Sequence, residues 1–101
     1  MFFIMDWQRW SGGALKVLAR FIDTIVVFKG ENRPLPYKFR YKDDQGGVRE
    51  LFVDKILLVT EQKVAGVTSL LYECQSDVDG EERRYQLRYI VPQCKWMIYK
   101  F

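Results

Sequence analysis

The stretch SLLYECQSDVDGEERRYQLRYIV, residues 69–91, decides the fold class. Two segments of alternating apolar and polar residues, 69–76 and 82–91, flank the turn sequence Asp-Val-Asp-Gly. Side chains alternate between the two faces of a β-strand, and Asp-Gly is typical of a two-residue hairpin turn. The stretch therefore predicts an antiparallel hairpin. One face of each strand is apolar: Leu70, Tyr72 and Cys74 on the first strand, and Tyr85, Leu87, Tyr89 and Val91 on the second.

A second alternating stretch, PLPYKFRYKD at residues 34–43, lies upstream of the hairpin. Pro36 suits the start of a strand, because proline lacks the N–H that the middle of a sheet requires. In the strand that follows, three rings and three cations point to opposite faces. We expect the rings to face the core and the cations to face water; the alternative is that the rings are exposed and stack on bases. The rings are Tyr37, Phe39 and Tyr41, and the cations are Lys38, Arg40 and Lys42.

Further strands are indicated on both sides of these stretches. The apolar run at residues 25–28 is typical of a strand buried on both faces, and residues 94–101 form a last strand. Residues 48–60 are long for one strand and their alternation slips, which predicts a bend or bulge near Asp54 and Lys55. Turn-forming residues mark loops at 30–34, 43–47 and 61–67. Five or six strands in sequential hairpins predict an all-β domain over residues 23–101, a small antiparallel barrel of the SH3-like or OB-like type.

Residues 1–22 form an N-terminal segment that fits two descriptions. Ser11 is a suitable helix N-cap, and apolar residues recur on one helical face between residues 14 and 22. Val17, Phe21 and Ile22 instead favour a strand. We expect a short helix over residues 14–22, with a strand as the alternative, packed on the barrel in either case.

Composition narrows the chemistry of this domain. The 101 residues are 49% hydrophobic and 16% aromatic, which is typical of a globular domain with one core. There is no histidine, so the most frequent acid–base and metal-binding side chain is missing. Cys74 and Cys94 cannot complete a four-ligand zinc site, and free thiols are favoured over a disulfide between them. The Asp-x-Asp-Gly at 77–80 resembles a calcium loop but lacks the glutamate that would follow at position 86. We therefore expect no enzyme activity, no metal and no cofactor.

The ends and hydrophobic runs of the chain bear on its location. The apolar start MFFIM lacks a basic leader and a cleavage site, so it does not match a secretory signal. No apolar run reaches the length of about 20 residues that spans a bilayer. We expect a cytoplasmic protein without a membrane partner.

Charge indicates one candidate function. The net charge of +3 permits an anionic partner without requiring one. If the strands at 37–42 and 82–91 were neighbours, their outward cations would form a basic stripe able to follow a phosphate backbone. The alternative is a solvated face balanced by carboxylates on adjacent strands. The nucleic-acid hypothesis rests on Lys38, Arg40, Lys42, Arg84 and Arg88.

The last strand indicates the other candidate function. Cys94, Trp96 and Ile98 share one face, so the residues between them form a second apolar stripe. Either a segment of this chain covers the stripe, or it meets a partner, of which a second copy of the chain is the simplest. The alternative function is therefore a protein-interaction or homodimerisation module, with Trp96, Met97, Tyr99 and Phe101 at its interface.

The C-terminal half also resembles known sequences. The blocks YECQSDVDGEERRYQLRY at 72–89 and CKWMIYK at 94–100 resemble a family of short uncharacterised bacterial proteins, and the likeness extends over about residues 33–100. The resemblance implies one all-β domain and supplies no activity. The proline–aromatic opening and the late tryptophan are also similar to the small module associated with bacterial Y-family DNA polymerases, which implies nucleic-acid binding. This chain lacks the neighbouring central tryptophans expected of that module.

Overall fold

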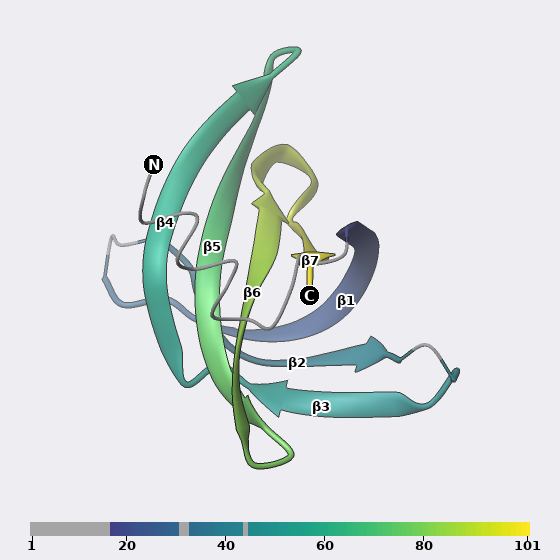
Figure 1. Ribbon diagram of the computed structural model, residues 1–101. Helices are drawn as coiled ribbons and strands as arrows, with labels where there is room; N and C mark the ends of the chain where they lie inside the picture. The colour runs from purple at the N-terminus through teal and green to yellow at the C-terminus, as the bar shows by residue number, and fades with distance from the viewer. Residues whose placement is uncertain (1–16, 31–32, 44) are drawn as a thin grey trace, which may run out of the picture.

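The computed structural model describes residues 17–30, 33–43 and 45–101, and these residues form one strongly curled antiparallel sheet (Figure 1). The sheet is a half-barrel of seven strands in the order β3-β2-β1-β7-β6-β5-β4. A single short 3-10 turn, η1 (Val91–Gln93), is the only helical element in these ranges. The strands are β1 (Val17–Val27), β2 (Leu35–Lys42), β3 (Val48–Phe52), β4 (Lys55–Val64), β5 (Val67–Val78), β6 (Glu81–Ile90) and β7 (Lys95–Lys100).

The all-β class is confirmed, and the expected number of five or six strands is wrong. Residues 48–60 were expected to be one bent strand, whereas the chain turns at Val53 and Asp54 and passes from β3 to β4. These are the two edge strands of the sheet, so the predicted bend is the corner at which the curled sheet brings its edges together. At this corner Ser76 Oγ in β5 donates a hydrogen bond to the Phe52 carbonyl oxygen at 2.6 Å.

The helix expected over residues 14–22 is wrong for its described part, because residues 17–22 belong to β1. Leu18 and Ile22 lie four residues apart, a spacing that places side chains on one face of a helix and equally on one face of a strand. Both side chains pack against the core from β1. Residues 1–16, including the proposed cap at Ser11, lie outside the described residues.

β1 is bent and shared between two parts of the sheet. Its first part pairs with β7 through Ile22, and its second part pairs with β2 from Asp23 to Val27. Figure 1 shows β2 and β3 running across the direction of β4, β5 and β6, with β1 curving from one direction to the other. The strand at residues 25–28 was expected to be buried on both faces, which is wrong: Ile25 is 58% and Phe28 66% exposed.

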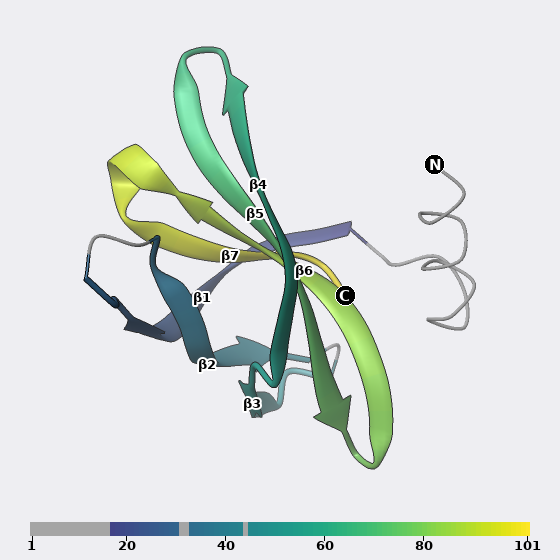
Figure 2. The same cartoon turned by 90° about the vertical axis from the view of Figure 1, so that its left-hand side faces the viewer.

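Two hairpins project at opposite ends of the half-barrel (Figures 1 and 2). The β5–β6 turn at Asp79 and Gly80 confirms the hairpin predicted from Asp-Gly, with both residues at positive φ. The loop expected at 61–67 is wrong, because β4 and β5 continue to a two-residue turn at Ala65 and Gly66. Both of these residues also have positive φ, as this turn type requires. Alanine rarely adopts that conformation, so Ala65 gave no signal for a turn as short as two residues.

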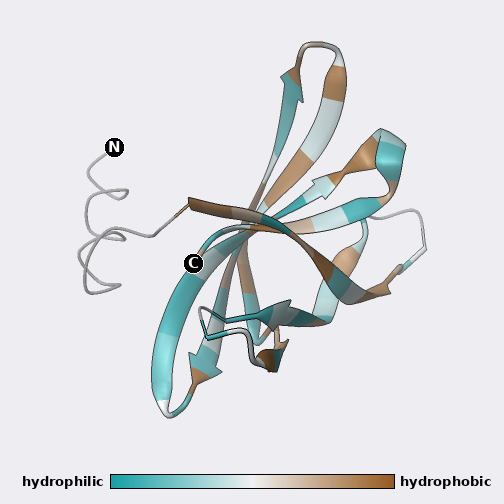
Figure 3. Cartoon of the chain, turned by 90° about the vertical axis from the view of Figure 1, so that its right-hand side faces the viewer, coloured by the Kyte–Doolittle hydropathy of each residue, from teal (hydrophilic) through white to brown (hydrophobic). Residues whose placement is uncertain are grey.

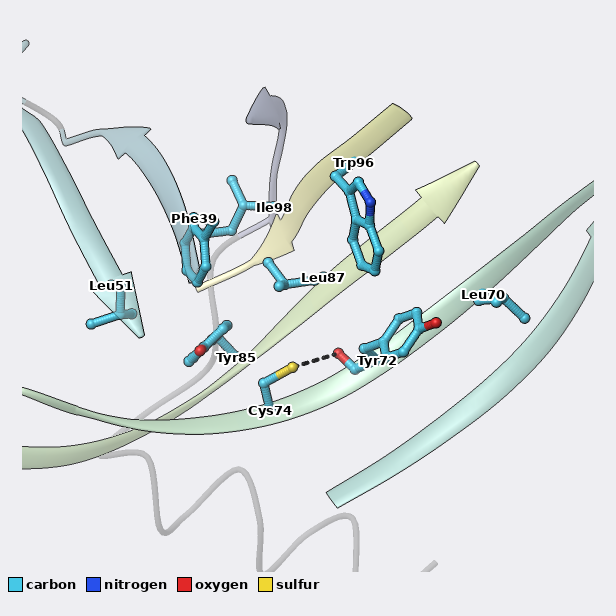
Figure 4. Close-up of a cluster of buried hydrophobic side chains, with 9 residues drawn as sticks. All are labelled: Phe39, Leu51, Leu70, Tyr72, Cys74, Tyr85, Leu87, Trp96 and Ile98. Carbon is cyan, nitrogen blue, oxygen red and sulfur yellow. Dashed lines mark hydrogen bonds between the residues drawn. The ribbon is translucent and has the colours of Figure 1, made fainter. Parts of the chain in front are cut away.

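The concave face of the half-barrel holds the core (Figure 4). Tyr72, Cys74, Tyr85 and Leu87 are fully buried there, as their alternation in the hairpin predicts. The two buried tyrosine hydroxyls make hydrogen bonds: Tyr72 Oη donates to the Pro34 carbonyl oxygen, and Tyr85 Oη lies 2.5 Å from Ser76 Oγ. The buried hydrophobic cluster consists of Phe39, Leu51, Leu70, Tyr72, Cys74, Tyr85, Leu87, Trp96 and Ile98.

The stretch at 37–42 is divided between the two faces in a way that alternation alone does not predict. Phe39 is buried and Tyr41 packs against the core, as expected. The β1–β2 register shifts by one residue between Lys38 and Pro36, so Tyr37 stands at a bulge and its ring is exposed. A bulge reverses which face the following side chains point to, and Tyr37 therefore leaves the face of Phe39 and Tyr41.

Candidate functional site

A cleft opens where β1 leaves β2, and we call it the β1–β2 cleft. Pairing between these strands ends at Asp23 and Arg40, beyond which β1 turns toward β7. The resulting cavity has a volume of about 450 Å³. Arg20 spans the divergence, since its guanidinium donates a 3.4 Å hydrogen bond to the Lys42 carbonyl oxygen. The lining residues are Arg20, Phe21, Ile22, Asp23, Arg40, Tyr41, Lys42, Val48 and Ile98.

The β1–β2 cleft is cationic. Three of its lining side chains, Arg20, Arg40 and Lys42, carry positive charge, and Asp23 alone opposes them within the lining. The Tyr41 hydroxyl is a neutral polar group there, because burial raises the pKa of that phenol. A cleft with two more cations than carboxylates and an apolar floor at Ile22 and Ile98 suits a partner that carries phosphate groups.

Next to the cleft, the outward face of β2 is partly neutralised by β3. Lys38 Nζ lies 3.0 Å from Glu50 Oε1, and an Arg40 nitrogen lies 3.6 Å from Glu50 Oε2. The hydrogen bond from Lys38 lowers the pKa of the Glu50 carboxyl. Glu50 is solvent-exposed, so this carboxylate limits the positive potential of the face more than it stabilises the fold.

The predicted basic residues fall into two groups. Lys38, Arg40 and Lys42 share β2, whereas Arg84 and Arg88 lie on β6, and strands β1 and β7 separate the two groups. The condition of neighbouring strands is therefore not met, and the five cations do not form one stripe. Arg88 is held on its own part of the sheet: it donates a 3.1 Å hydrogen bond to Gln62, and its guanidinium lies 4.2 Å from the centroid of the Tyr99 ring.

The residues proposed for an interface are also divided. Trp96 is buried, with its ring centroid 5.1 Å from that of Tyr72, and Phe101 stacks on Tyr85 at 5.6 Å. Met97 and Tyr99 are half-buried, and Tyr99 lies beneath Arg88. Since β7 is an interior strand between β1 and β6, its backbone is already paired on both sides. Of the four residues, this leaves Met97 and Tyr99 for an interface on the other side of β7.

Arg20 was not predicted as a site residue, although it contributes as much charge to the cleft as any predicted residue. Its segment was expected to be a helix, and nothing in the spacing of residues 14–22 indicates that Arg20 lies next to Lys42. Its placement depends on the bulge at Ala19 (φ 48°), which shifts the β1–β7 register between Val17 and Arg20.

The described residues, 17–30, 33–43 and 45–101, offer neither a metal site nor a membrane-spanning helix. No cluster of three or more cysteine, aspartate or glutamate side chains there is arranged to hold a metal ion. Cys74 is buried and Cys94 exposed, and both are free thiols. None of the described segments forms a helix of the length and hydrophobicity that crossing a membrane requires.

Comparison with protein-family models, with curated proteins and with solved structures finds no significant match to this chain. The geometry of the cleft and of the surface around it is therefore the basis for a functional assignment.

Proposed function

We propose that this protein binds nucleic acid through the β1–β2 cleft, with Arg20, Arg40 and Lys42 holding phosphate groups. The observation that carries the proposal is the convergence of three cations, from two strands that diverge, on one cleft of about 450 Å³. Two of the three were predicted from the alternation at 37–42, and the third comes from the bent strand β1. Arginine and lysine side chains supply most phosphate contacts in nucleic-acid complexes.

The lining of the cleft supports a binding role over a catalytic one. Its single carboxylate, Asp23, lies among cations, and besides the cations Arg20, Arg40 and Lys42 the remaining titratable lining group is the phenol of Tyr41, whose pKa is raised by burial. Proton transfer near neutral pH requires a group that changes protonation there. The proposal is therefore a binding module without enzyme activity.

The proposal also includes the type of small barrel and the cellular location of the protein. The small-barrel type expected from the sequence, SH3-like or OB-like, has its support in the corner at Val53 and Asp54, where the two edge strands meet. A cytoplasmic location has its support in the free thiols of Cys74 and Cys94, since thiols persist in reducing compartments.

The proposal is tested by removing charge from the cleft. Fluorescence anisotropy with a labelled oligonucleotide, repeated over a salt series, measures both the affinity and its dependence on salt. The double variant Arg20→Gln, Arg40→Gln is expected to weaken binding about tenfold at low salt. It should also reduce the log–log salt slope by about 1.4 to 1.8, because each lost phosphate contact removes about 0.7 to 0.9.

A matched control removes the same charge elsewhere. Lys55 and Lys63 are exposed on β4. This strand pairs with neither β1 nor β2, the two strands that form the cleft. The double variant Lys55→Gln, Lys63→Gln should change affinity less than threefold if the cleft is the site. Equal losses in both double variants would show attraction to net charge alone, and absence of binding by the wild type at low salt would remove the proposal.

A substitution at Glu50 should act in the opposite direction. Because Glu50 pairs with both Lys38 and Arg40, Glu50→Gln leaves two cations without their carboxylate. We expect tighter binding by about threefold and a salt slope steeper by about 1, measured in the same anisotropy series. Glu61→Gln on β4 is the control and should leave both quantities unchanged; an equal gain in that variant would contradict a local effect.

A further inference from the structure

Three aromatic rings are exposed on the convex face of the sheet. Phe21 in β1 is 59% exposed, and Tyr37 in β2 and Phe52 in β3 are each 51% exposed. The core lies on the concave face of these strands, and no other described strand covers the three rings on the convex face. Large rings in water are unfavourable, and clusters of them on a surface usually mark a binding site.

Two of these rings each have a lysine side chain over one face. Lys38 Nζ is 5.0 Å from the centroid of Phe52, and Lys95 Nζ is 5.3 Å from that of Phe21. Tyr37 extends the first unit, since its ring meets that of Phe52 edge-on at 5.6 Å and 81°. A ring with a flexible cation at its face matches both parts of a nucleotide, because the ring stacks on the base and the cation holds the phosphate.

Of the three cations of the cleft, Arg40 lies between the two ring–lysine units in the strand register, whereas Lys42 and Arg20 lie at the end that holds Phe21. In the strand register Phe52 is opposite Lys38, which is opposite Ile25, four residues from Phe21 along β1. The units are therefore two strands and four residues apart. With the usual spacing between strands and the usual rise per residue, this separation is about 16 Å. Arg40 lies between them in the neighbouring row, opposite Asp23. Figure 3 shows hydrophobic segments recurring along β1, interrupted by polar ones.

We propose that the ligand is single-stranded nucleic acid, whose unpaired bases stack on Phe52 with Tyr37 and on Phe21. This inference rests on the proposed function, since Arg40 would hold a phosphate between the stacked bases and Arg20 and Lys42 would hold phosphates next to Phe21. A duplex presents its phosphates but keeps its bases stacked on one another, so it would lose the contribution of the rings. The exposed aliphatic residues Ile25 and Val27 lie beside the rings and would also suit a protein partner. The lysines over the rings favour the anionic partner.

The test separates bases from phosphates. Anisotropy is measured with a labelled oligothymidine, with an abasic strand of the same length and charge, and with a duplex of the same length. The wild type should bind oligothymidine at least tenfold more tightly than either of the other two. Phe52→Leu and Phe21→Leu keep most of the apolar area but remove the ring face, and each should weaken oligothymidine binding by about fivefold or more. Neither variant should change the affinity for the abasic strand or the salt slope.

Phe28→Leu is the matched control, because Phe28 is an exposed ring that directly follows β1; the variant should leave the affinity unchanged. Thermal unfolding of each variant confirms that the sheet is intact. Equal affinity of the wild type for all three ligands, with a steep salt slope, would overturn base stacking and leave the proposed function standing. Binding of none of them would remove the proposed function itself. If Phe52→Leu instead abolished a concentration-dependent dimer seen by light scattering, without affecting oligothymidine, the rings would belong to a protein interface and the inference would fail.

Discussion

Raising the pH from 9 to 12 is expected to unfold this protein. Burial raises the pKa of the Cys74 thiol from an ordinary value of 9.0 to about 12, and that of Tyr72 from 10.0 to about 12. Burial also raises the pKa of Tyr85 from its ordinary value of 10.0. All three groups are neutral at pH 7 whether the chain is folded or unfolded, so they make no difference to stability there. Above pH 9 to 10 they ionise in the unfolded chain alone, which draws the equilibrium toward unfolding.

The expected size of this effect is large. Each group that ionises only on unfolding removes up to about 1.4 kcal/mol of stability per pH unit, so the three together remove at most about 4 kcal/mol per unit between pH 10 and 12. A domain of this length has a total stability of about 5 to 15 kcal/mol. Urea unfolding followed by circular dichroism at pH 8, 10 and 11 measures the loss directly.

Two cysteine variants isolate one part of the effect. Cys74→Ala removes a buried thiol and should flatten the pH dependence by about one third, even though it lowers stability at neutral pH. Cys94→Ala removes the exposed thiol and should change the pH dependence much less than Cys74→Ala does. If the absorbance of tyrosinate showed every tyrosine ionising near pH 10 while circular dichroism remained native, the burial of Tyr72 and Tyr85 would be wrong.

Replacing Leu87 by alanine is expected to reduce the free energy of unfolding by about 2 to 5 kcal/mol. Leu87 lies on the concave face, paired in the register with Tyr72 on β5 and Ile98 on β7, and it is fully buried. Removing its side chain leaves a cavity that two β-strand neighbours, fixed by their own hydrogen bonds, cannot collapse to fill. The loss is a large fraction of the stability of a domain of this size.

Leu58→Ala is the matched control for this prediction. The chemical change is the same, but Leu58 lies on the edge strand β4 and is half-exposed. The free energy of unfolding of this variant is expected to stay within about 0.5 kcal/mol of the wild-type value. Denaturant titration of both variants gives the comparison, and similar losses at the two positions would contradict the assignment of the core to the concave face.

Part of the candidate site was predictable from local pattern. Arg40 and Lys42 were placed on an outward face because side chains on a strand alternate, which depends on backbone geometry alone. Arg20, Phe21 and Phe52 were not predicted as site residues. Their relevance depends on which strands become neighbours, and a register shift of one residue at Tyr37 or Ala19 is enough to change which side chains share a surface.

The sequence by itself determined the all-β class, the β5–β6 hairpin and the buried face of that hairpin. These features follow from alternation and turn chemistry over a few consecutive residues. Only the tertiary structure decided that β1 bends between β7 and β2, that β3 and β4 are the two edges of one sheet, and that Arg20 meets Lys42. Pairing between strands distant in the chain is selected by burial over the whole core, and no single segment of the sequence carries that information.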